Sequence, residues 1–286
     1  MFSQETAFTI TNGQIAYYAA HLREQERAEN TVKRYVHDLR DLMAFLDGRP
    51  ITKGAVIAWK ERLADMYAPA TVNSMLAAAN GFFLFMDWPK LSVRPLKVQR
   101  PLFRDESREM TRAEYVRLVE AARRQGNERL ALLLQTICAT GIRVSELRFI
   151  TVEAAAAGRA IVSSKGKRRT VFLPGKLCGL LKKYLKKQKI TDGSVFVTRT
   201  GKPLDRSNIW RDMKALCESA GVEPDKVFPH NLRHLFAQTY YSVEKDLSRL
   251  ADILGHSNVS TTRIYTAESG LVHARQMERL GLILTT

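Results

Sequence analysis

A basic, proline-punctuated stretch at residues 89–109 divides this chain into two halves that both have helical periodicity. Proline interrupts a helix because it lacks the amide donor and clashes with the preceding turn. The prolines are Pro89, Pro95 and Pro101, and the basic residues that add charge include Lys90, Arg94, Lys97, Arg100 and Arg104. With 286 residues, the chain is long enough for two domains with separate cores. We therefore expect one domain over residues 1–88 and another over residues 110–286, joined by this linker.

The first half carries apolar residues at the three-and-four spacing of helices that bury one face. This spacing predicts four helices in residues 11–87. They run from about Asn12 to Glu24, from an N-cap at Asn30, from Thr52, and from Ala70 to Met86. The apolar stripes are core positions, and they predict a helical bundle.

The second half mixes helices with one short pair of strands. Thr111 and Glu114 form a capping box, and a later helix begins at Asp205 or Ser207. That later helix is expected to carry Ile209, Trp210, Met213 and Leu216 and to end at Gly221. Strands at residues 159–164 and 169–173 flank a glycine-containing turn and predict a hairpin. The fold class is therefore mainly α with a small antiparallel β-sheet.

The stretch from Phe228 to Tyr265 gathers residues that can bind and attack a phosphate group. A helix beginning near His230 would carry Arg233 one turn later on the same face. A second helix ends at Gly255, since glycine tolerates the left-handed conformation of a helix stop. His256 then lies just beyond that stop, and Tyr265 follows one short helix later. Two imidazoles, a guanidinium and a phenol can thus converge around one anion.

Each residue type in this stretch has a chemical use. A phenol with an ordinary pKa of about 10 is a poor nucleophile at neutral pH and needs activating neighbours. Guanidinium groups bind two phosphate oxygens at once, and histidine can donate or accept a proton. His230 and His234, four residues apart, could instead bind a metal, but no carboxylate or cysteine ligand set accompanies them.

A second arginine follows an apolar helix in the segment Gly141-Ile142-Arg143-Val144-Ser145-Glu146. The glycine turn would fix the Arg143 guanidinium at the edge of the core. Glu146, three residues later, can brace it. Taken alone, Arg143 and Glu146 would be interpreted as a structural salt bridge.

Charge favours a polyanionic partner. The formal net charge is +16, and the first 100 residues hold 13 Lys and Arg against 10 Asp and Glu. The rest of the chain holds 32 basic against 19 acidic residues, and such an excess favours nucleic acid. The three cysteines are scattered without metal-ligand spacing, as in a reduced intracellular protein. No signal peptide or membrane-spanning run is found, so a cytoplasmic location is expected.

Together, the segments around Arg143, His230 and Tyr265 resemble the tyrosine recombinase (phage integrase) family. The resemblance implies a two-domain DNA clamp, with a helical core-binding (SAM-like) domain at residues 1–88 and an α+β catalytic domain at residues 110–286. It implies a site-specific DNA recombinase or integrase that needs no metal or other cofactor. Residues 254–266 are very similar to Xer-type recombinases, whereas the tail from about 267 is not, so a mobile-element integrase is equally compatible. No arm-binding domain is expected.

The resemblance also implies six catalytic residues: Arg143, Lys165, His230, Arg233, His256 and Tyr265. Tyr265 would attack the phosphate, and Lys165 would protonate the leaving 5′-oxygen. Lys167 is an alternative to Lys165, because the hairpin turn is shorter than in many relatives. Candidates for DNA contacts are Lys33, Arg34, Lys60, Asn73, Lys97, Arg100, Lys167, Arg168 and Arg169, although basic residues on exposed faces are commonly just solvated.

The implied partners are double-stranded DNA with inverted-repeat core sites and, on DNA, three further copies of the chain in a homo-tetramer. The free protein is expected to be a monomer, and an accessory DNA-bending protein is possible. An apolar cluster at residues 280–284 is expected to dock on its own domain or on a neighbouring subunit. Other interpretations are a type IB topoisomerase, a non-catalytic DNA-binding regulator and a metal-dependent nuclease, for which no ligand cluster is found.

Overall fold

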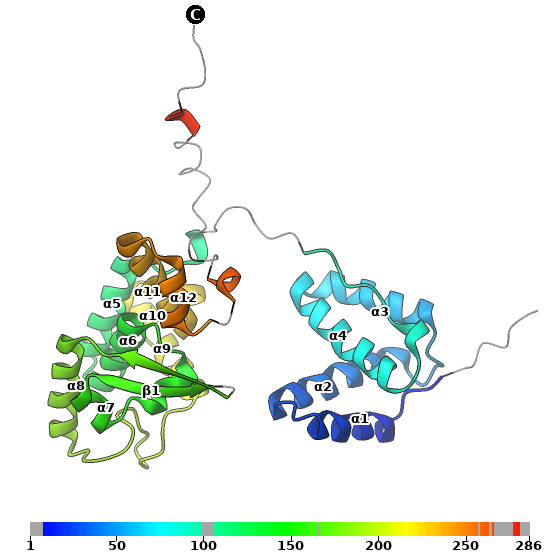
Figure 1. Ribbon diagram of the computed structural model, residues 1–286, viewed down its shortest axis with the longest axis horizontal. Coiled ribbons are helices and arrows are strands. Elements are labelled where there is room, and N and C mark those ends of the chain that lie inside the picture. The colour runs from blue at the N-terminus through cyan, green and yellow to red at the C-terminus, as the bar shows by residue number, and fades with distance from the viewer. Residues whose placement is uncertain are drawn as a thin grey trace, which may run out of the picture. The chain divides into compact units, whose positions relative to one another are not determined.

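The computed structural model describes residues 8–98, 106–164, 166–256, 258–262, 265 and 277–280. The chain divides into two compact units, Met1–Arg100 and Pro101–Thr286, which we describe separately (Figure 1). In the part of the chain so described, no helix is long and apolar enough to span a membrane.

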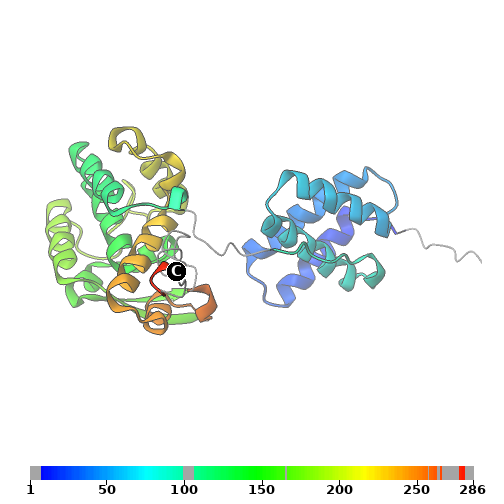
Figure 2. The same cartoon turned by 90° about the horizontal axis from the view of Figure 1, so that it is seen from above.

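The first unit is a bundle of four α-helices followed by one short 3-10 helix, seen from a second side in Figure 2. They are α1 (Asn12–Glu24), α2 (Glu29–Leu46), α3 (Lys53–Met66), α4 (Pro69–Phe85) and η1 (Pro89–Leu91). Thr52 caps α3 by accepting a hydrogen bond from the amide of Ala55 at 3.1 Å, as predicted. Asn30, by contrast, lies inside α2, whose N-cap is Ala28. The four predicted helices are confirmed, and the cap of the second was wrong by two residues.

The core of the first unit is aromatic as well as aliphatic. Trp59, Phe82 and Phe83 are fully buried, and the Trp59 indole donates to Asp41 Oδ1 at 2.8 Å. Burying each of these side chains contributes about 1.5–3 kcal/mol. Most positions of the predicted stripes are buried, but Ile57 on α3 is 41% exposed.

The second unit contains the remaining elements. Its first helices are η2 (Glu106–Arg108), α5 (Arg112–Arg124), α6 (Glu128–Thr140), η3 (Val144–Phe149) and α7 (Val152–Ala157). The hairpin β1 (Arg159–Ser164) and β2 (Lys167–Phe172) follows, and then α8 (Gly175–Gln188), α9 (Arg206–Lys214), α10 (Cys217–Ala220) and η4 (Pro224–Lys226). The last elements are α11 (Pro229–Glu244), α12 (Leu247–Leu254) and η5 (Val259–Thr261).

Helix α6 is the centre of the second unit. It packs against α5, α8 and α11, and Leu133, Leu134 and Ile137 on it are fully buried (Figure 1). The predicted capping box begins the neighbouring helix α5: Thr111 Oγ1 accepts from the Glu114 amide at 3.2 Å. This arrangement confirms the mainly helical fold, with α6 carrying its C-terminal end to the hairpin side of the unit.

The two strands form an antiparallel hairpin, as predicted, but with a tighter turn. Ser164 pairs with Lys167, so the second strand begins two residues earlier than expected. Gly166, with φ of +75°, supplies the left-handed residue that such a turn requires. The sheet packs against η3 and α7, which places the hairpin beside the Arg143 turn.

Helix α9 is shorter than predicted: it ends at Lys214, before Leu216, and Gly221 ends the separate helix α10. Asp205 caps α9 at the Asn208 amide, as predicted, and Ile209 and Met213 are buried. Trp210 is 51% exposed. The apolar face follows the spacing of Ile209, Met213 and Leu216, and Trp210 lies one position off that stripe.

Candidate active site

The end of α6 positions the first arginine. Gly141 ends this helix in the left-handed region at φ +62°, and a Cβ there would lie 2.4 Å from Cδ1 of Phe236. Only glycine fits both the conformation and the space. The turn brings Arg143 to the N-cap of η3, with its side chain 35% exposed.

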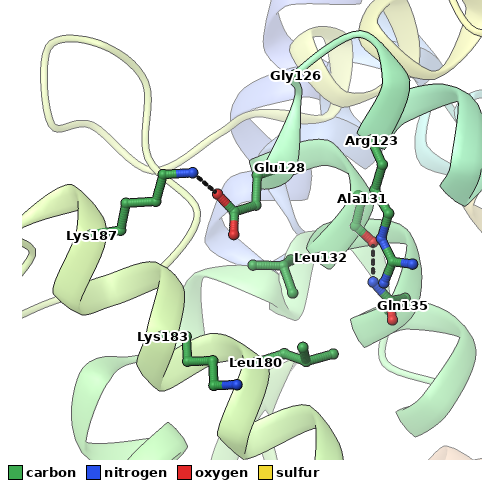
Figure 3. A pocket seen from close by; sticks show the side chains of 9 residues that line it. All are labelled: Arg123, Gly126, Glu128, Ala131, Leu132, Gln135, Leu180, Lys183 and Lys187. Atoms are coloured by element: carbon green, nitrogen blue, oxygen red, sulfur yellow. Dashed lines mark hydrogen bonds and ion pairs between the residues drawn. The ribbon is translucent and has the colours of Figure 1, made fainter.

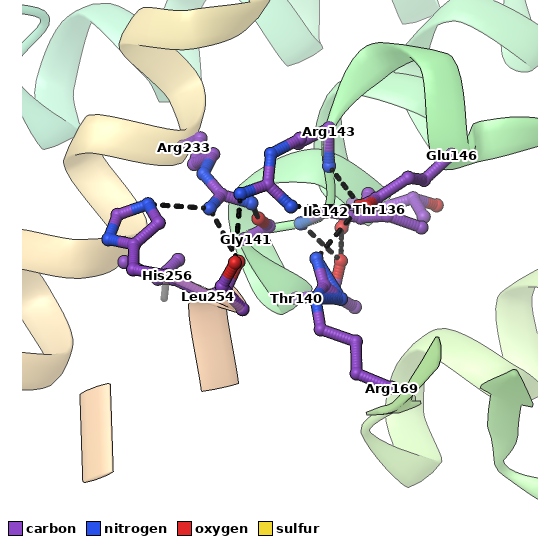
Figure 4. A network of polar contacts seen from close by, with 11 residues as sticks. Thr136, Thr140, Gly141, Ile142, Arg143, Glu146, Arg169, Arg233, Leu254 and His256 are labelled. Carbon is purple, nitrogen blue, oxygen red and sulfur yellow. Dashed lines mark hydrogen bonds and ion pairs between the residues drawn. The ribbon is translucent and has the colours of Figure 1, made fainter. Parts of the chain in front are cut away.

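A buried carboxylate holds two arginines together (Figure 4). Glu146, whose side chain is 2% exposed, accepts from Arg143 Nη1 at 3.2 Å and from Arg169 Nη2 at 2.8 Å. It also accepts from the Arg143 amide at 3.0 Å. The predicted brace between Arg143 and Glu146 is thus present, and Arg169 joins it from strand β2.

Arg233 is the most buried of the arginines. It extends from α11 and donates to the carbonyl oxygen of Gly141 and, at 2.7 Å, to that of Leu254. Its Nη2 also lies 3.1 Å from His256 Nε2 (Figure 4). One guanidinium therefore ties the end of α6 to the end of α12. Burial and the neighbouring Arg143 lower the pKa of Arg233 to about 10, an effect that Tyr265 opposes.

Gly255 is the second glycine that the site requires. It ends α12 at φ +66°, as predicted, and its carbonyl oxygen accepts from Arg143 Nη2 at 3.2 Å. A Cβ here would lie 2.5 Å from Nε and 2.6 Å from Cδ of Arg169. The missing side chain is what lets the hairpin arginine approach the end of α12.

We expect Gly255→Ala to lower the free energy of unfolding by roughly 2–5 kcal/mol, because strain at positive φ and a clash with Arg169 act together. Gly221→Ala is the matched control. Gly221 ends α10 at φ +59° with nothing within 4 Å of the added Cβ, so only the conformational cost of about 1–2 kcal/mol applies. Urea denaturation of both variants measures the difference, and equal losses would show that Arg169 does not fill this space.

His256 is neutral and held in one tautomer. Arg233 Nη2 can only donate, so Nε2 of His256 accepts, and the proton lies on Nδ1. Nδ1 then donates to Thr262 Oγ1 at 2.8 Å. Burial, followed by the charges of Arg233, Arg143 and Arg169, lowers the pKa of His256 to about 4.

This shift predicts a pH dependence of stability. In the unfolded chain a histidine takes up its proton below about pH 6.5, whereas folded His256 resists protonation down to about pH 4. The contribution of His256 to stability is therefore complete above pH 6.5 and is lost as the pH falls toward 4. Denaturation at pH 7.5 and 5.0 measures this effect. The free energy of unfolding should decrease less between these two pH values for His256→Asn than for the original chain. Equal losses would contradict the depressed pKa.

Tyr265 lies among the histidines. Its ring centroid is 4.6 Å from that of His234, edge to face, and 6.1 Å from that of His256, with the rings nearly parallel. His230 lies 4.6 Å from His234 on the other side. The Tyr265 side chain is 3% exposed and packs in a small apolar cluster with Leu250 and Leu254.

The cluster carries more positive than negative charge. Arg143 and Arg169 both pair with the carboxylate of Glu146, whereas Arg233 donates to backbone carbonyls and has no ion-pair partner among the described residues. Two guanidinium nitrogens of Arg169, Nε and Nη1, are buried with no partner among the described residues. Desolvation and Arg233 also lower the pKa of His230. An uncompensated positive potential of this kind is suited to bind an anion.

A cavity of about 580 Å³ opens on this cluster and is lined by Arg143, His230 and Arg233. A second hollow of about 340 Å³ lies between α6 and α8, where Lys187 pairs with Glu128 at 2.8 Å (Figure 3). None of the side chains lining that hollow belongs to the arginine network. Within the described ranges, no group of three or more His, Cys, Asp or Glu residues could hold a metal ion.

The structure brings five of the six predicted catalytic residues into one place: Arg143, His230, Arg233, His256 and Tyr265. The sixth, Lys165, lies outside the described residues, as does Arg100, and the side chain of Lys167 is not described. The choice between Lys165 and Lys167 therefore stays a prediction. Arg168, at the hairpin, is exposed.

Three residues were assigned to DNA contacts but have partners within the protein. Arg169 pairs with Glu146 and is 14% exposed, so in this state it is not a surface ligand for phosphate. Asn73 bonds both the amide and the carbonyl of Leu96, and Lys60 donates to the carbonyl of Arg94. These side chains fix the segment after η1. The others whose side chains are described, Lys33, Arg34 and Lys97, are exposed.

Two contributors were not among the predicted catalytic residues. Thr262 accepts from His256 Nδ1, and the His234 ring contacts the rings of both His230 and Tyr265. Both residues lie inside the motifs that the sequence analysis describes, and this position was the evidence in the sequence that could have identified them. In the apolar tail, Leu280 is 64% exposed, and residues 281–286 lie outside the described part.

Comparison with known proteins agrees with this geometry. Residues 108–270 match the model of the phage integrase family, and residues 15–90 match the phage integrase N-terminal SAM-like domain. Tyrosine recombinase XerD of Xanthomonas campestris pv. campestris is 31% identical over 276 residues, covering 85% of this chain and 83% of that protein. Tyrosine recombinase XerC of Roseiflexus castenholzii is 29% identical over 280 residues, covering 89% of this chain and 88% of that protein.

A crystal structure of a lambda integrase dimer bound to a COC′ core site has the same fold. The TM-score is 0.75 at 17% sequence identity, and the match covers 91% of this chain and 96% of that one. At this identity the likeness concerns the fold alone.

Proposed function

Because the chain belongs to the phage integrase family, we propose that it is a site-specific DNA recombinase whose nucleophile is Tyr265. The Tyr265 oxygen attacks the scissile phosphorus, the bond to the 5′-oxygen breaks, and a 3′-phosphotyrosyl link forms. The released 5′-hydroxyl then attacks the equivalent link on a partner duplex. Since the covalent link conserves the phosphodiester bond, the exchange needs no external energy source.

The observation that supports this proposal is a buried phenol beside an excess of arginine. Tyr265 lies against Arg233 and between His234 and His256. Arg143 and Arg233 stabilise the charge that develops on the non-bridging oxygens of the phosphate. Arg143 is 35% exposed and can meet a phosphate directly, whereas Tyr265 is 3% exposed and has to shift to reach it.

The two histidines are assigned to proton transfer. His230 is assigned to assist deprotonation of the Tyr265 hydroxyl, and His256 to donate to a phosphate oxygen. In the free site Nε2 of His256 accepts from Arg233, so donation requires a proton at this nitrogen. A bound phosphate offsets the positive potential that lowers the His256 pKa, and so favours uptake of that proton.

A covalent-capture experiment tests the function. The protein is incubated in EDTA with a pool of nicked duplexes of randomised sequence, and SDS-resistant protein–DNA adducts are recovered and sequenced. The nick lets the short 5′-hydroxyl fragment diffuse away and so traps the intermediate. We expect adducts at an inverted-repeat site and, on intact duplexes of that sequence, recombinant strands. Adducts without exchange would favour the topoisomerase alternative, and no adduct would favour a regulator.

A substrate with sulfur in place of the 5′-bridging oxygen distinguishes the two lysines. A thiolate leaves without protonation, so this substrate should restore cleavage to a variant that lacks only the general acid. We expect Lys165→Ala to cleave the normal substrate at least about a hundredfold more slowly and to regain most of its rate on the sulfur substrate. Rescue of Lys167→Ala instead would assign the role to Lys167.

DNA is the partner that the family membership supports, and the lambda integrase neighbour is itself bound to a DNA core site. We further propose that strand exchange takes place in a homo-tetramer on two duplexes and that an accessory DNA-bending protein can assist. Sedimentation of the protein on the selected duplex, with and without a second duplex, tests the tetramer.

A further inference from the structure

An exposed tryptophan lines the cavity that opens on the active site. Trp210 is 51% exposed and lines the 580 Å³ cavity that also contacts Arg143, His230 and Arg233. A large aromatic side chain left in water beside a binding site commonly marks a contact surface. Neither the phosphate chemistry nor the core of α9 uses it.

Three cavity-lining residues on α9 recur every fourth position: Arg206, Trp210 and Lys214. Residues four apart share one face of a helix, so a basic–aromatic–basic row faces the cavity. The buried residues Ile209 and Met213 lie on the adjacent face and anchor the helix. The row is thus presented by a rigid element.

The indole is held in place on one side. The Lys214 ammonium lies 5.4 Å from the centroid of the Trp210 ring and donates to the carbonyl oxygen of Pro224. This cation–π contact fixes the ring, while half of the side chain stays accessible to a ligand. Arg206 is close enough to the site to contribute to the lowered pKa of His230.

The cavity is larger than a phosphate group needs and falls in the range of nucleotide-sized ligands. A phosphate on Arg143 and Arg233 would leave the α9 wall facing the next nucleotide of the same strand. Aromatic rings contact the apolar faces of nucleotides without regard to sequence, and arginine and lysine pair with the neighbouring phosphates.

We propose that Trp210 binds the nucleotide adjoining the scissile phosphate, with Arg206 and Lys214 on the flanking phosphates. The inference rests on the proposed function, since it takes DNA cleaved by Tyr265 as the ligand. Trp210 therefore positions the strand for attack by Tyr265.

Tryptophan fluorescence can report on Trp210 separately from the other tryptophans. The chain has three tryptophans, and the other two, Trp59 and Trp88, are at most 9% exposed. The acrylamide quenching constant of the accessible tryptophan emission should fall at least about threefold when the protein is saturated with the selected duplex. The Trp210→Phe variant should lack this accessible emission. An unchanged quenching constant in a complex that a mobility shift shows to be saturated would overturn the proposal and leave the recombinase function standing. If no duplex is bound or cleaved, the proposed function itself fails.

Cleavage kinetics give the second readout. Trp210→Ala should lower kcat/KM for the nicked duplex about tenfold, on the scale of one lost base–aromatic contact, and Trp210→Phe should recover most of the loss. Phe172→Ala is the matched control, because Phe172 is 74% exposed in the same unit and does not line the cavity. Equal losses in Trp210→Ala and Phe172→Ala, or none in either, would contradict the proposal.

Discussion

Tyr265→Phe is expected to abolish covalent linkage to DNA. The change removes the only atom that can attack phosphorus and keeps the ring, which packs against His234, Leu250 and Leu254. Adduct formation on the nicked duplex should fall below detection, a loss of at least about a millionfold by analogy with other enzymes that lose their nucleophile. Binding of the same duplex, measured by mobility shift, should change by less than about threefold.

The fold should tolerate this change. The lost hydroxyl interacts with Arg233, so we expect a cost of only about 1 kcal/mol in the free energy of unfolding. Tyr241→Phe is a suitable control, because Tyr241 packs against the same apolar cluster from α11 and its ring contacts Lys245. A Tyr265→Phe protein that still forms adducts would disprove the assignment of the nucleophile.

Replacing Arg233 should have the next largest effect. Loss of a donor aimed at transition-state charge slows comparable reactions by about 100- to 1000-fold. Arg233→Ala also leaves the carbonyls of Gly141 and Leu254 without their donor, so it should both slow cleavage about 1000-fold and destabilise the catalytic unit. Single-turnover cleavage and urea denaturation measure the two effects.

Two further variants separate chemistry from stability. Arg233→Lys keeps a charge but not the planar fork, and it should still cleave about a hundredfold more slowly. Arg143→Ala removes a guanidinium that is 35% exposed, so it should slow cleavage as Arg233→Ala does and destabilise the catalytic unit less, because Arg169 still pairs with Glu146. If Arg233→Lys keeps a tenth or more of the cleavage rate, bidentate phosphate binding by this residue is excluded.

The free site is arranged for an anion. Three guanidinium groups lie at the site and two of them pair with the buried Glu146 carboxylate, and the pKa values of Arg169, Arg233 and His256 all lie below their usual range. Burial is the largest cause in each case, and the charge of Arg143 contributes in each. A phosphate would relieve this repulsion, so part of the affinity for DNA should come from neutralising a strained set of charges.

The sequence by itself determined the local structure around the site. The capping box at Thr111, the cap at Thr52 and the stop at Gly255 depend on hydrogen bonds and dihedral angles within one helical turn. A residue's own neighbours in sequence decide such features. The same signals failed at Asn30, because packing of the α2 stripe outweighed a single favourable cap.

Only the tertiary structure decided what each polar side chain bonds to. Arg169 reaches Glu146 across 23 residues, Arg233 reaches Gly141 across 92, and Arg143 reaches Gly255 across 112. The sequence shows that these arginines are charged but does not show which groups they bond, because the bonding partners depend on which helix ends meet in the fold. For the same reason the sequence predicted a DNA contact for Asn73 and no function for Trp210, whereas in the fold Asn73 bonds the backbone of Leu96 and Trp210 lines the cavity.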